Sequence, residues 1–280
     1  MSDSYECFTV ETSEKIAHLR FTRPEKANSM IPSFWTELPD AVTSLSDAGE
    51  ARVLVISAEG KHFSSGMDIS VFMQGGVDAD PANPHVDAER FVHFLKGLQD
   101  AFTALEEARM PVLCAIQGGA IGAGVDLVSA ADCRYATADA FFVIQETEVG
   151  MTADVGTYPR LVRLIPEGWV RQLSYTAERL PAAKAKEIGL VNEVYPDAET
   201  MLNAVLEIAG RIAVHSPLAV TGCKRMINYV PGRTTADALA HVATWNAAML
   251  RPDDLKEAFT AKMEKRTPKF DDLKPVRRRL

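Results

Sequence analysis

The sequence lacks a continuous apolar run of about 18 residues, the length at which a membrane-spanning helix becomes a candidate. It also lacks a basic segment followed by an apolar one near its start, which a secretory signal requires. We therefore expect no membrane span and no secretion. The chain ends in RRRL, which differs from the Ser-Lys-Leu address of peroxisomes. We accordingly expect a cytoplasmic protein.

Cysteine and histidine are too few and too scattered to suggest a metal site or a disulfide framework. The 4 cysteines form no CxxC pair, and the 6 histidines show no HxxxH or HExxH spacing. Zinc sites and redox motifs depend on such spacings. We therefore predict reduced thiols and no bound metal.

Glycine-rich turns are present, but they do not have the spacing of nucleotide-binding loops. The sequence contains no G-x-G-x-x-G, no G-x-x-x-x-G-K-[ST] and no G-x-S-x-G. These patterns mark dinucleotide-binding proteins, P-loop proteins and α/β-hydrolases respectively. The net charge of −8 also argues against a nucleic-acid-binding surface. We expect neither nucleic acid as a partner nor a dinucleotide cofactor.

Short apolar strands alternate with amphipathic helices along the 280 residues. Continuous apolar runs at 52–57 and 111–116 are typical of parallel strands buried on both faces. A long amphipathic helix is expected at 88–108, after a surface loop at 74–87 that is rich in Gly, Pro and Asp. Three or four helices follow residue 200. The pattern predicts an α/β fold with right-handed crossovers and a helical tail.

Two loops, each following an apolar strand, place glycines beside main-chain amides. One is HFSSGMD at 62–68, and the other is QGGAIGAGVDL at 117–127. Amides at a helix start lack intrahelical acceptors, so they can donate to an oxygen that becomes negative during a reaction. Tight structural turns would explain either loop alone about equally well. Together the two loops favour a site that holds one oxygen from two sides.

Acidic side chains lie in apolar surroundings shortly after the second loop. The stretch IQETEVGMTADVG carries Glu146, Glu148 and Asp154, and the apolar helix before it carries Asp126. Burial of a carboxylate is costly unless it is paired, hydrogen-bonded or protonated. We interpret Glu148 as a solvated surface residue. Structural roles compete for two others: Asp126 near a helix N-terminus, and Asp154 as the cap of a helix starting near Val155.

The order of these features resembles the enoyl-CoA hydratase/isomerase, or crotonase, superfamily. HFSSGMD followed by PVLCAIQGGAIGAGVDL is similar to its two oxyanion loops, and FTRPEKANSM is similar to its first substrate loop. The likeness spans residues 8–265. It implies a crotonase-like α/β spiral of ββα units, an acyl-CoA thioester substrate and a homotrimer or dimer of trimers. Coenzyme A would enter only as part of the substrate. We expect a core domain at 1–200 and a C-terminal helical oligomerisation region at 201–280.

The resemblance also suggests individual site residues. The amides of Met67 and Ala123 would form the oxyanion hole for the thioester oxygen. Asp126, Glu146 and Asp154 are similar to the Asp, Glu and Asp of the Δ3,5-Δ2,4-dienoyl-CoA isomerases, and the surrounding AFF, VG and ADVGT strengthen that match. The other residues expected at the substrate are Arg23, Lys26, Ala27, Phe63, Ser65, Gly66, Asp68, Gly122 and Phe259.

Three activities remain open within this resemblance, and we expect the isomerase. Shifting the double bonds from 3,5 to 2,4 removes a proton at C2 and adds one at C6. A single carboxylate cannot easily reach both of these carbons. By analogy Glu146 serves C2 and Asp154 serves C6, while Asp126 tunes the pair, with at least one raised pKa among them. A hydratase would instead hold one water between Asp126 and Glu146, leaving Asp154 without a role. The third activity is non-catalytic binding of acyl-CoA or RNA, and the negative charge argues against RNA.

Overall fold

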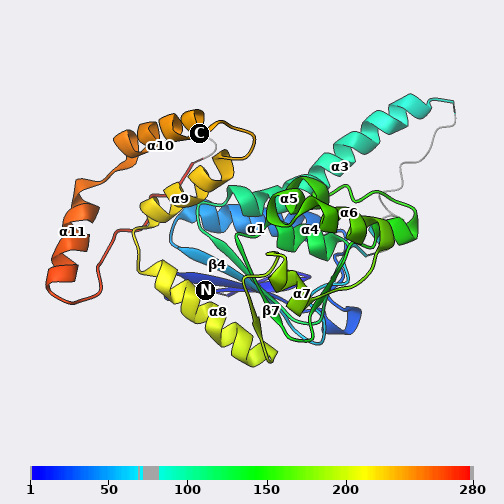
Figure 1. Ribbon diagram of the computed structural model, residues 1–280, viewed down its shortest axis with the longest axis horizontal. Coiled ribbons are helices and arrows are strands. Elements are labelled where there is room, and N and C mark those ends of the chain that lie inside the picture. Colours follow the sequence, from blue (N-terminus) through cyan, green and yellow to red (C-terminus); the bar gives the residue numbers. More distant parts are fainter. Residues whose placement is uncertain (1, 69, 72–81, 278–280) are drawn as a thin grey trace.

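The computed structural model describes residues 2–68, 70–71 and 82–277. Its frame is a seven-stranded sheet in the order β1-β2-β3-β4-β5-β7-β10, with helices on both faces (Figure 1). The first three strands are antiparallel, and the strands from β3 to β10 run parallel. The strands of this sheet are β1 (Ser2–Ser4), β2 (Phe8–Ser13), β3 (Ile16–Phe21), β4 (Val53–Ala58), β5 (Val112–Ile116), β7 (Cys133–Thr137) and β10 (Glu193–Tyr195).

Helices connect the parallel strands and continue beyond the sheet. The predicted helix at 88–108 is α3, which begins slightly earlier. Of the loop predicted at 74–87, residues 74–81 lie outside the described residues. The α-helices are α1 (Phe34–Ala48), α3 (Pro84–Glu107), α4 (Ala123–Ala130), α5 (Thr157–Leu164), α6 (Glu167–Thr176), α7 (Ala182–Glu187), α8 (Ala198–Ala213), α9 (Pro217–Tyr229), α10 (Thr235–Met249) and α11 (Pro252–Met263). The short 3-10 helices are η1 (Pro24–Lys26) and η2 (Glu146–Val149).

Both faces of the large sheet are covered, which explains why β4 and β5 are almost entirely apolar. Val53 and Val55 of β4 pack in one cluster with the apolar face of α8. Leu54 and Ile56, which alternate with them, lie in the main core together with side chains of α1 and α3. Successive side chains of a strand point to opposite faces, so a strand covered on both sides is mainly apolar. The apolar runs expected at 52–57 and 111–116 are confirmed as β4 and β5.

A second, three-stranded sheet carries the glycine-rich turn and the acidic stretch. Its order is β6 (Gly119–Ile121), β8 (Phe141–Val143) and β9 (Leu180–Pro181). β6 runs directly into α4, and β8 runs directly into η2. Because β6 and β8 are parallel neighbours, the helix starts that follow them lie at the same edge of this sheet. The sheet therefore brings the start of α4 close to Glu146.

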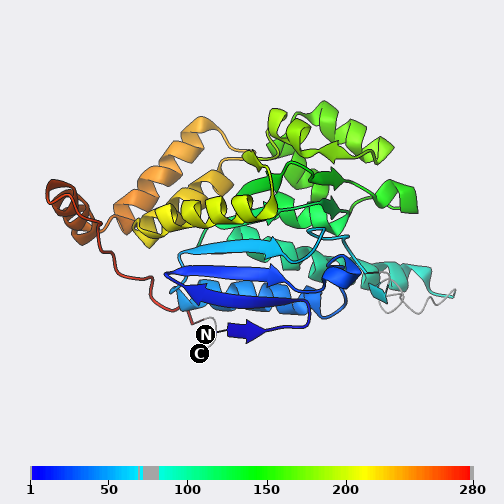
Figure 2. The ribbon, with the colours of Figure 1, turned by 90° about the horizontal axis from the view of Figure 1, so that it is seen from below.

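We call the helices α9, α10 and α11 the C-terminal arm. α9 packs on the end of α3, and α10 and α11 extend away from the sheet (Figures 1 and 2). α10 contains no buried residue, and Ala261 is the one buried residue of α11. Beyond α11 the chain returns to the core. There the guanidinium of Arg52 donates to the carboxylate of Asp272 at 3.0 Å and to the Phe270 carbonyl at 2.6 Å. The arm is thus held to the core at both of its ends.

The predicted boundary after residue 200 falls inside α8. Met201, Val205 and Ala209 of this helix pack on the large sheet, so α8 lies with the core rather than with the arm. The division into two domains itself stays a prediction. Across the part of the chain that the structure describes, no single helix is long and apolar enough to cross a membrane, although α8 and α9, bent by 108° at their junction, pass that test together.

Candidate active site

A cavity of about 490 Å³ opens where the two glycine loops meet the acidic stretch. It brings together residues that are far apart in the sequence: both predicted amides and all three predicted acids border it. Its lining residues are Lys26, Ser29, Ser65, Met67, Asp68, Gly122, Ala123, Asp126, Gln145, Glu146, Val149, Met151, Asp154 and Val155. The cavity thus has both polar groups and an apolar wall, as expected of a small-molecule site.

The two glycine loops are joined by main-chain hydrogen bonds. The amide of Ser64 donates to the Gly119 carbonyl, and the Ser64 carbonyl accepts from the Ile121 amide, each at 3.0 Å. Gly66 has a φ of +85°, and a Cβ there would lie 2.5 Å from the Ile121 carbonyl oxygen and 3.1 Å from the Ala123 nitrogen. No side chain fits at this position. A glycine is therefore required for the first loop to approach the start of α4.

Met67 and Ala123 both line the cavity, and their main-chain amides are the predicted oxyanion donors. Neither amide is the donor of a hydrogen bond to another described residue. Ala123 is the first residue of α4 and follows Gly122, whose φ of +53° turns the chain into the helix. Amides at this position have no acceptor within the helix. Both groups are thus available to donate into the cavity, and their action on a single oxygen stays a prediction.

Asp126 is buried inside α4, with only 1% of its surface exposed. Its Oδ1 accepts a 2.6 Å hydrogen bond from the hydroxyl of Thr157, the first residue of α5. Burial raises the pKa of Asp126 to about 7, the negative charge of Glu146 adds to that effect, and the Thr157 bond opposes it. The sequence analysis quoted Thr157 only as the last residue of ADVGT and gave it no role. Asp126 therefore changes its protonation close to neutral pH.

Glu146 and Asp154 border the same cavity from either end of the acidic stretch. Burial raises the pKa of Glu146, and repulsion from Asp154 raises it further. Burial also raises the pKa of Asp154. The Oε2 atom of Glu146 is buried and has no hydrogen-bond partner in the described part of the chain. A buried oxygen without a donor favours the protonated form of Glu146, unless a bound molecule supplies a hydrogen bond to it.

Two structural interpretations of the acids can now be decided. Asp154 does not cap a helix: α5 begins at Thr157, its cap position is Gly156, and no side chain caps it. The capping interpretation is therefore wrong. Glu148 is exposed, as we predicted, because η2 turns it away from the cavity that Glu146 borders.

Asn28 organises the substrate loop, and the sequence analysis did not single it out. It is 5% exposed, adopts a φ of +52°, and accepts a 2.9 Å hydrogen bond from the Arg23 amide. Its side-chain amide donates to the carbonyls of Glu59 and His62, each at 2.9 Å. Asn is one of the few residues that tolerate this left-handed backbone. Asn28 thus joins the first substrate loop to the loop that carries Met67.

Of the remaining predicted substrate residues, four border the cavity and five do not. Lys26, Ser65, Asp68 and Gly122 line it. The five residues outside the lining are Arg23, Ala27, Phe63, Gly66 and Phe259. Hydrogen bonds from Ser29 and Ser70 lower the pKa of Asp68 to about 2, so this lining residue is a fixed negative charge.

Each of the five has a structural reason for lying elsewhere. Arg23 donates to the Ser29 carbonyl at 2.8 Å, and Ala27 accepts from the Ser65 amide at 2.9 Å, so both shape the loop. Phe63 points into the core and packs against Phe21, with ring centroids 5.4 Å apart. Gly66 shapes the loop that carries Met67, because a Cβ at this position would lie 2.5 Å from the Ile121 carbonyl oxygen.

Phe259 is the fifth, and it lies on α11 with 65% of its surface exposed. In Figure 1 this helix lies at the far left of the molecule, well away from α4 and α5. Within one chain Phe259 does not line the cavity, and its contact with substrate stays a prediction.

Known proteins resemble this chain over nearly its whole length. A sequence profile of the enoyl-CoA hydratase/isomerase family matches residues 11–274. The mitochondrial Δ(3,5)-Δ(2,4)-dienoyl-CoA isomerase of Rattus norvegicus is 39% identical, over 95% of this chain and 82% of its own. The peroxisomal protein of the same name from Arabidopsis thaliana is 38% identical, over 94% of this chain and 95% of its own. The crystal structure of an enoyl-CoA hydratase from Bacillus anthracis has a TM-score of 0.85 at 27% identity, covering 95% of this chain and 99% of that one.

Proposed function

The chain belongs to the enoyl-CoA hydratase/isomerase family, and we propose that it converts 3,5-dienoyl-CoA thioesters into 2,4-dienoyl-CoA thioesters. The predicted family and the crotonase-like α/β fold are confirmed. The choice of reaction within the family depends on the site. Support comes from the two relatives, which are named dienoyl-CoA isomerases and match the chain almost end to end.

The single observation that carries the proposal is the third acid on the cavity. Asp154 borders the same space as Asp126 and Glu146, and its charge acts on Glu146 strongly enough to raise that pKa. A hydratase would need only Asp126 and Glu146, to hold one water, and would leave Asp154 without a role. Two acids along one cavity suit a substrate whose reacting carbons are C2 and C6.

In the proposed mechanism the thioester oxygen accepts hydrogen bonds from the Met67 and Ala123 amides. Glu146 in its carboxylate form removes a proton from C2, and the electron pair of that C–H bond delocalises onto the thioester oxygen. The two amides would stabilise the resulting dienolate, because main-chain donors held in fixed loops need no reorganisation as the charge develops. Asp154 in its protonated form then delivers a proton to C6. The raised pKa values of both side chains support this division into base and acid.

Asp126 would act on this pair through its charge. It lies under the cavity with a pKa of about 7 and repels Glu146 when ionised. A protonated Asp126 leaves Glu146 freer to ionise, and an ionised Asp126 favours a protonated Glu146. The direction of proton transfer between the two ends is therefore sensitive to this third group.

Hydration of 2-enoyl-CoA is the second candidate, because Asp126 and Glu146 also border one cavity. A hydratase would need both acids to hold one water. The Oδ1 atom of Asp126 is already occupied by Thr157, and Asp126 is 1% exposed, so it is poorly placed for a water in the cavity. Asp154 would also have no function. These observations favour the isomerase.

Incubation with a 3,5-dienoyl-CoA tests the proposal directly. The conjugated 2,4-dienoyl product absorbs in the ultraviolet, so its formation can be followed continuously. A parallel assay with a 2-enoyl-CoA measures hydration by the loss of its absorbance. Turnover of the diene with slow hydration supports the isomerase. Fast hydration without diene turnover would show that the protein is a hydratase. Acyl-CoA binding with no turnover in either assay would identify a non-catalytic binder.

Assembly and compartment belong to the proposal as well. We propose that the C-terminal arm joins copies of the chain into a trimer or a dimer of trimers, since α10 buries none of its residues within one chain. The relatives are named mitochondrial and peroxisomal, so the cytoplasmic location that we predicted stays a prediction. Size measurement in solution and localisation of the tagged full chain would test these two points.

A further inference from the structure

The segment that carries Asp154 lies between η2 and α5 and belongs to neither helix. Two side chains hold its main chain. The side-chain amide of Gln99 donates to the Asp154 carbonyl at 2.7 Å, and the guanidinium of Arg160 donates to the Val155 carbonyl at 3.2 Å. Both contacts are made to the backbone at or beside the acid. The position of the Asp154 carboxyl therefore depends on Gln99 and Arg160.

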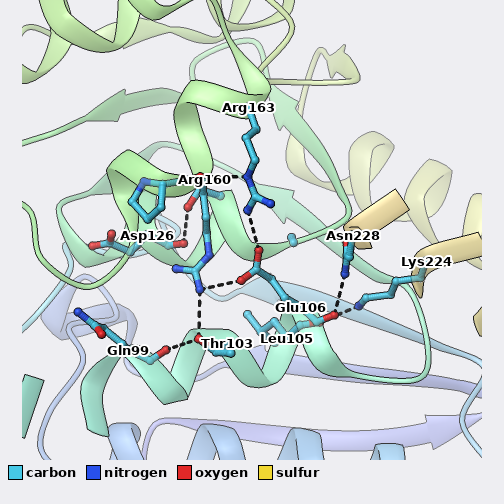
Figure 3. A network of polar contacts seen from close by, with 12 residues as sticks. Gln99, Thr103, Leu105, Glu106, Asp126, Arg160, Arg163, Lys224 and Asn228 are labelled. Carbon is cyan, nitrogen blue, oxygen red and sulfur yellow. Dashed lines mark hydrogen bonds and ion pairs between the residues drawn. The ribbon is translucent and has the colours of Figure 1, made fainter. Parts of the chain in front are cut away.

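Arg160 is itself anchored on α3, as Figure 3 shows. Its Nη2 donates to Oε2 of Glu106 at 2.9 Å and to the hydroxyl of Thr103 at 3.4 Å. Only 6% of Arg160 is exposed. Its side chain passes so close to Gly156 that a Cβ there would lie 1.7 Å from Nη1. A glycine two residues after Asp154 thus leaves room for the guanidinium.

The end of α3 that carries Glu106 is fixed in turn by α9. The buried ammonium of Lys224 donates to the Leu105 carbonyl at 2.7 Å and to the Met110 carbonyl at 3.1 Å. Asn228 donates to the Glu106 carbonyl at 3.1 Å (Figure 3). Glu106 therefore stands on a helix end that cannot easily shift, which makes it a rigid support for Arg160.

We propose that Arg160, braced by Glu106, is a positioning residue that holds Asp154 in place for the proton transfer at the far end of the acyl chain. This inference rests on the proposed isomerase function and extends it to a residue outside the cavity lining. Arg160 does not touch substrate. It acts by fixing the backbone of Asp154 relative to Glu146, because misplacement of a reacting group by about 1 Å can cost about 10²-fold in rate.

Arg163 provides a matched control within the same helix. It donates to the other oxygen of Glu106 at 3.1 Å, but its further bond, to the Pro159 carbonyl at 3.0 Å, stays within α5. It is 41% exposed and makes no contact with the Asp154 segment among the described hydrogen bonds. The two arginines thus share one carboxylate and differ in whether they hold that segment.

The test compares Arg160→Met with Arg163→Met in the full chain, using a 3,5-dienoyl-CoA in D₂O. For Arg160→Met we expect kcat to fall about 10²-fold while KM changes only a few-fold, because the oxyanion amides and Glu146 are untouched. Deuterium exchange at C2 of the substrate, read by mass spectrometry, should continue near the wild-type rate. Arg163→Met should match the wild type in all three measurements.

A second pair of variants covers the case in which Arg160→Met fails to fold. Arg160→Lys keeps the positive charge beside Glu106 and loses the forked donor, so it should fold and still show reduced kcat. Gln99→Leu removes the other contact to the segment and should lower kcat in the same way. In both variants, amide hydrogen exchange of residues 152–158 should be faster than in the wild type.

Two results would overturn the inference while leaving the proposed function intact. One is a wild-type kcat in folded Arg160→Lys and Gln99→Leu. The other is a loss of C2 exchange in parallel with kcat, which would point to general damage of the site. If the wild type itself does not isomerise the diene, the proposed function fails, and the positioning role of Arg160 in that reaction fails with it.

Discussion

Thr157 donates its hydroxyl proton to Oδ1 of Asp126 over 2.6 Å, at a place where neither residue exposes more than 1% of its surface. A donated hydrogen bond stabilises the charged carboxylate, while burial and the nearby Glu146 destabilise it. Burial is the largest of these effects, so the pKa stands near 7 instead of the ordinary 3.8. Thr157 therefore moderates the pKa of a buried acid that would otherwise lie higher.

Folding stability should consequently fall as the pH rises from about 4 to about 7. Below this window the folded and unfolded chains both hold the Asp126 proton. Within it only the unfolded chain releases the proton, at a cost to the fold of about 1.4 kcal/mol for each unit of raised pKa. Asp126→Asn removes this titration and can still accept from Thr157.

Urea unfolding of wild type and Asp126→Asn at several pH values would measure the difference. The variant should gain stability relative to the wild type as the pH rises through the window, with a plateau above about pH 7. The neighbours that also titrate, Glu146 and Asp154, are present in both proteins. A difference that stays constant with pH would show that Asp126 has an ordinary pKa.

Replacement of Glu146 by Gln should abolish isomerisation and C2 exchange together, because it removes the proposed base at C2. We expect a loss of about 10²–10⁴ in kcat, the range typical of general acid-base groups. Glu148→Gln is the matched control, since Glu148 is exposed and does not border the cavity. The diene assay compares the two. Equal activity of both variants would remove Glu146 from the mechanism.

Replacement of Asp154 by Asn should separate the two proton transfers. Isomerisation should fall by about 10²–10⁴, since an amide cannot deliver a proton to C6. Exchange of the C2 proton with D₂O should persist, because Glu146 and the two amides remain. Nuclear magnetic resonance of the recovered substrate distinguishes the positions. If instead C2 exchange disappears in this variant, while a 2,4-dienoyl-CoA still exchanges its C6 proton, the roles of the two acids are reversed.

Gly66→Ala should impair catalysis by displacing the Met67 amide. The added Cβ would lie 2.5 Å from the Ile121 carbonyl oxygen, and the φ of +85° is unfavourable for alanine. Losing one oxyanion donor costs about 10²–10³ in rate, and we expect a kcat loss in that range. Gly210→Ala in α8 is the control, because a Cβ there meets nothing within 4 Å. It should stabilise the fold by about 0.5–1 kcal/mol and leave turnover unchanged.

The features that the sequence predicted well are those with a local physical cause. A strand covered on both faces is mainly apolar, and the run at 52–57 accordingly became β4 (Val53–Ala58). Gly66 and Gly122 stood out because their backbone conformations exclude other residues. The acids Asp126 and Glu146 stood out because a charge is unusual in apolar surroundings.

The features that the sequence did not predict depend on contacts between distant segments. The Thr157 hydroxyl becomes significant only where α5 packs on α4, 31 residues after Asp126. Arg160 binds Glu106, which lies 54 residues away in the sequence. The sequence around Arg160 does not indicate that this arginine pairs with Glu106. Phe63 and Phe259 were both expected at substrate, yet one is buried in the core and the other is exposed on the arm. An aromatic residue in a motif does not reveal which way its ring points.

Because the chain returns from α11 to Arg52, the C-terminal arm is attached to the core at both of its ends and is not a free tail. A single protease cut between α10 and α11 would therefore release nothing at once. The piece after the cut would keep its bonds at Asp272 and Val276, the latter through the 2.8 Å hydrogen bond from its amide to the Asp47 carbonyl. The nicked protein should run as one species on a native gel and as two fragments in detergent.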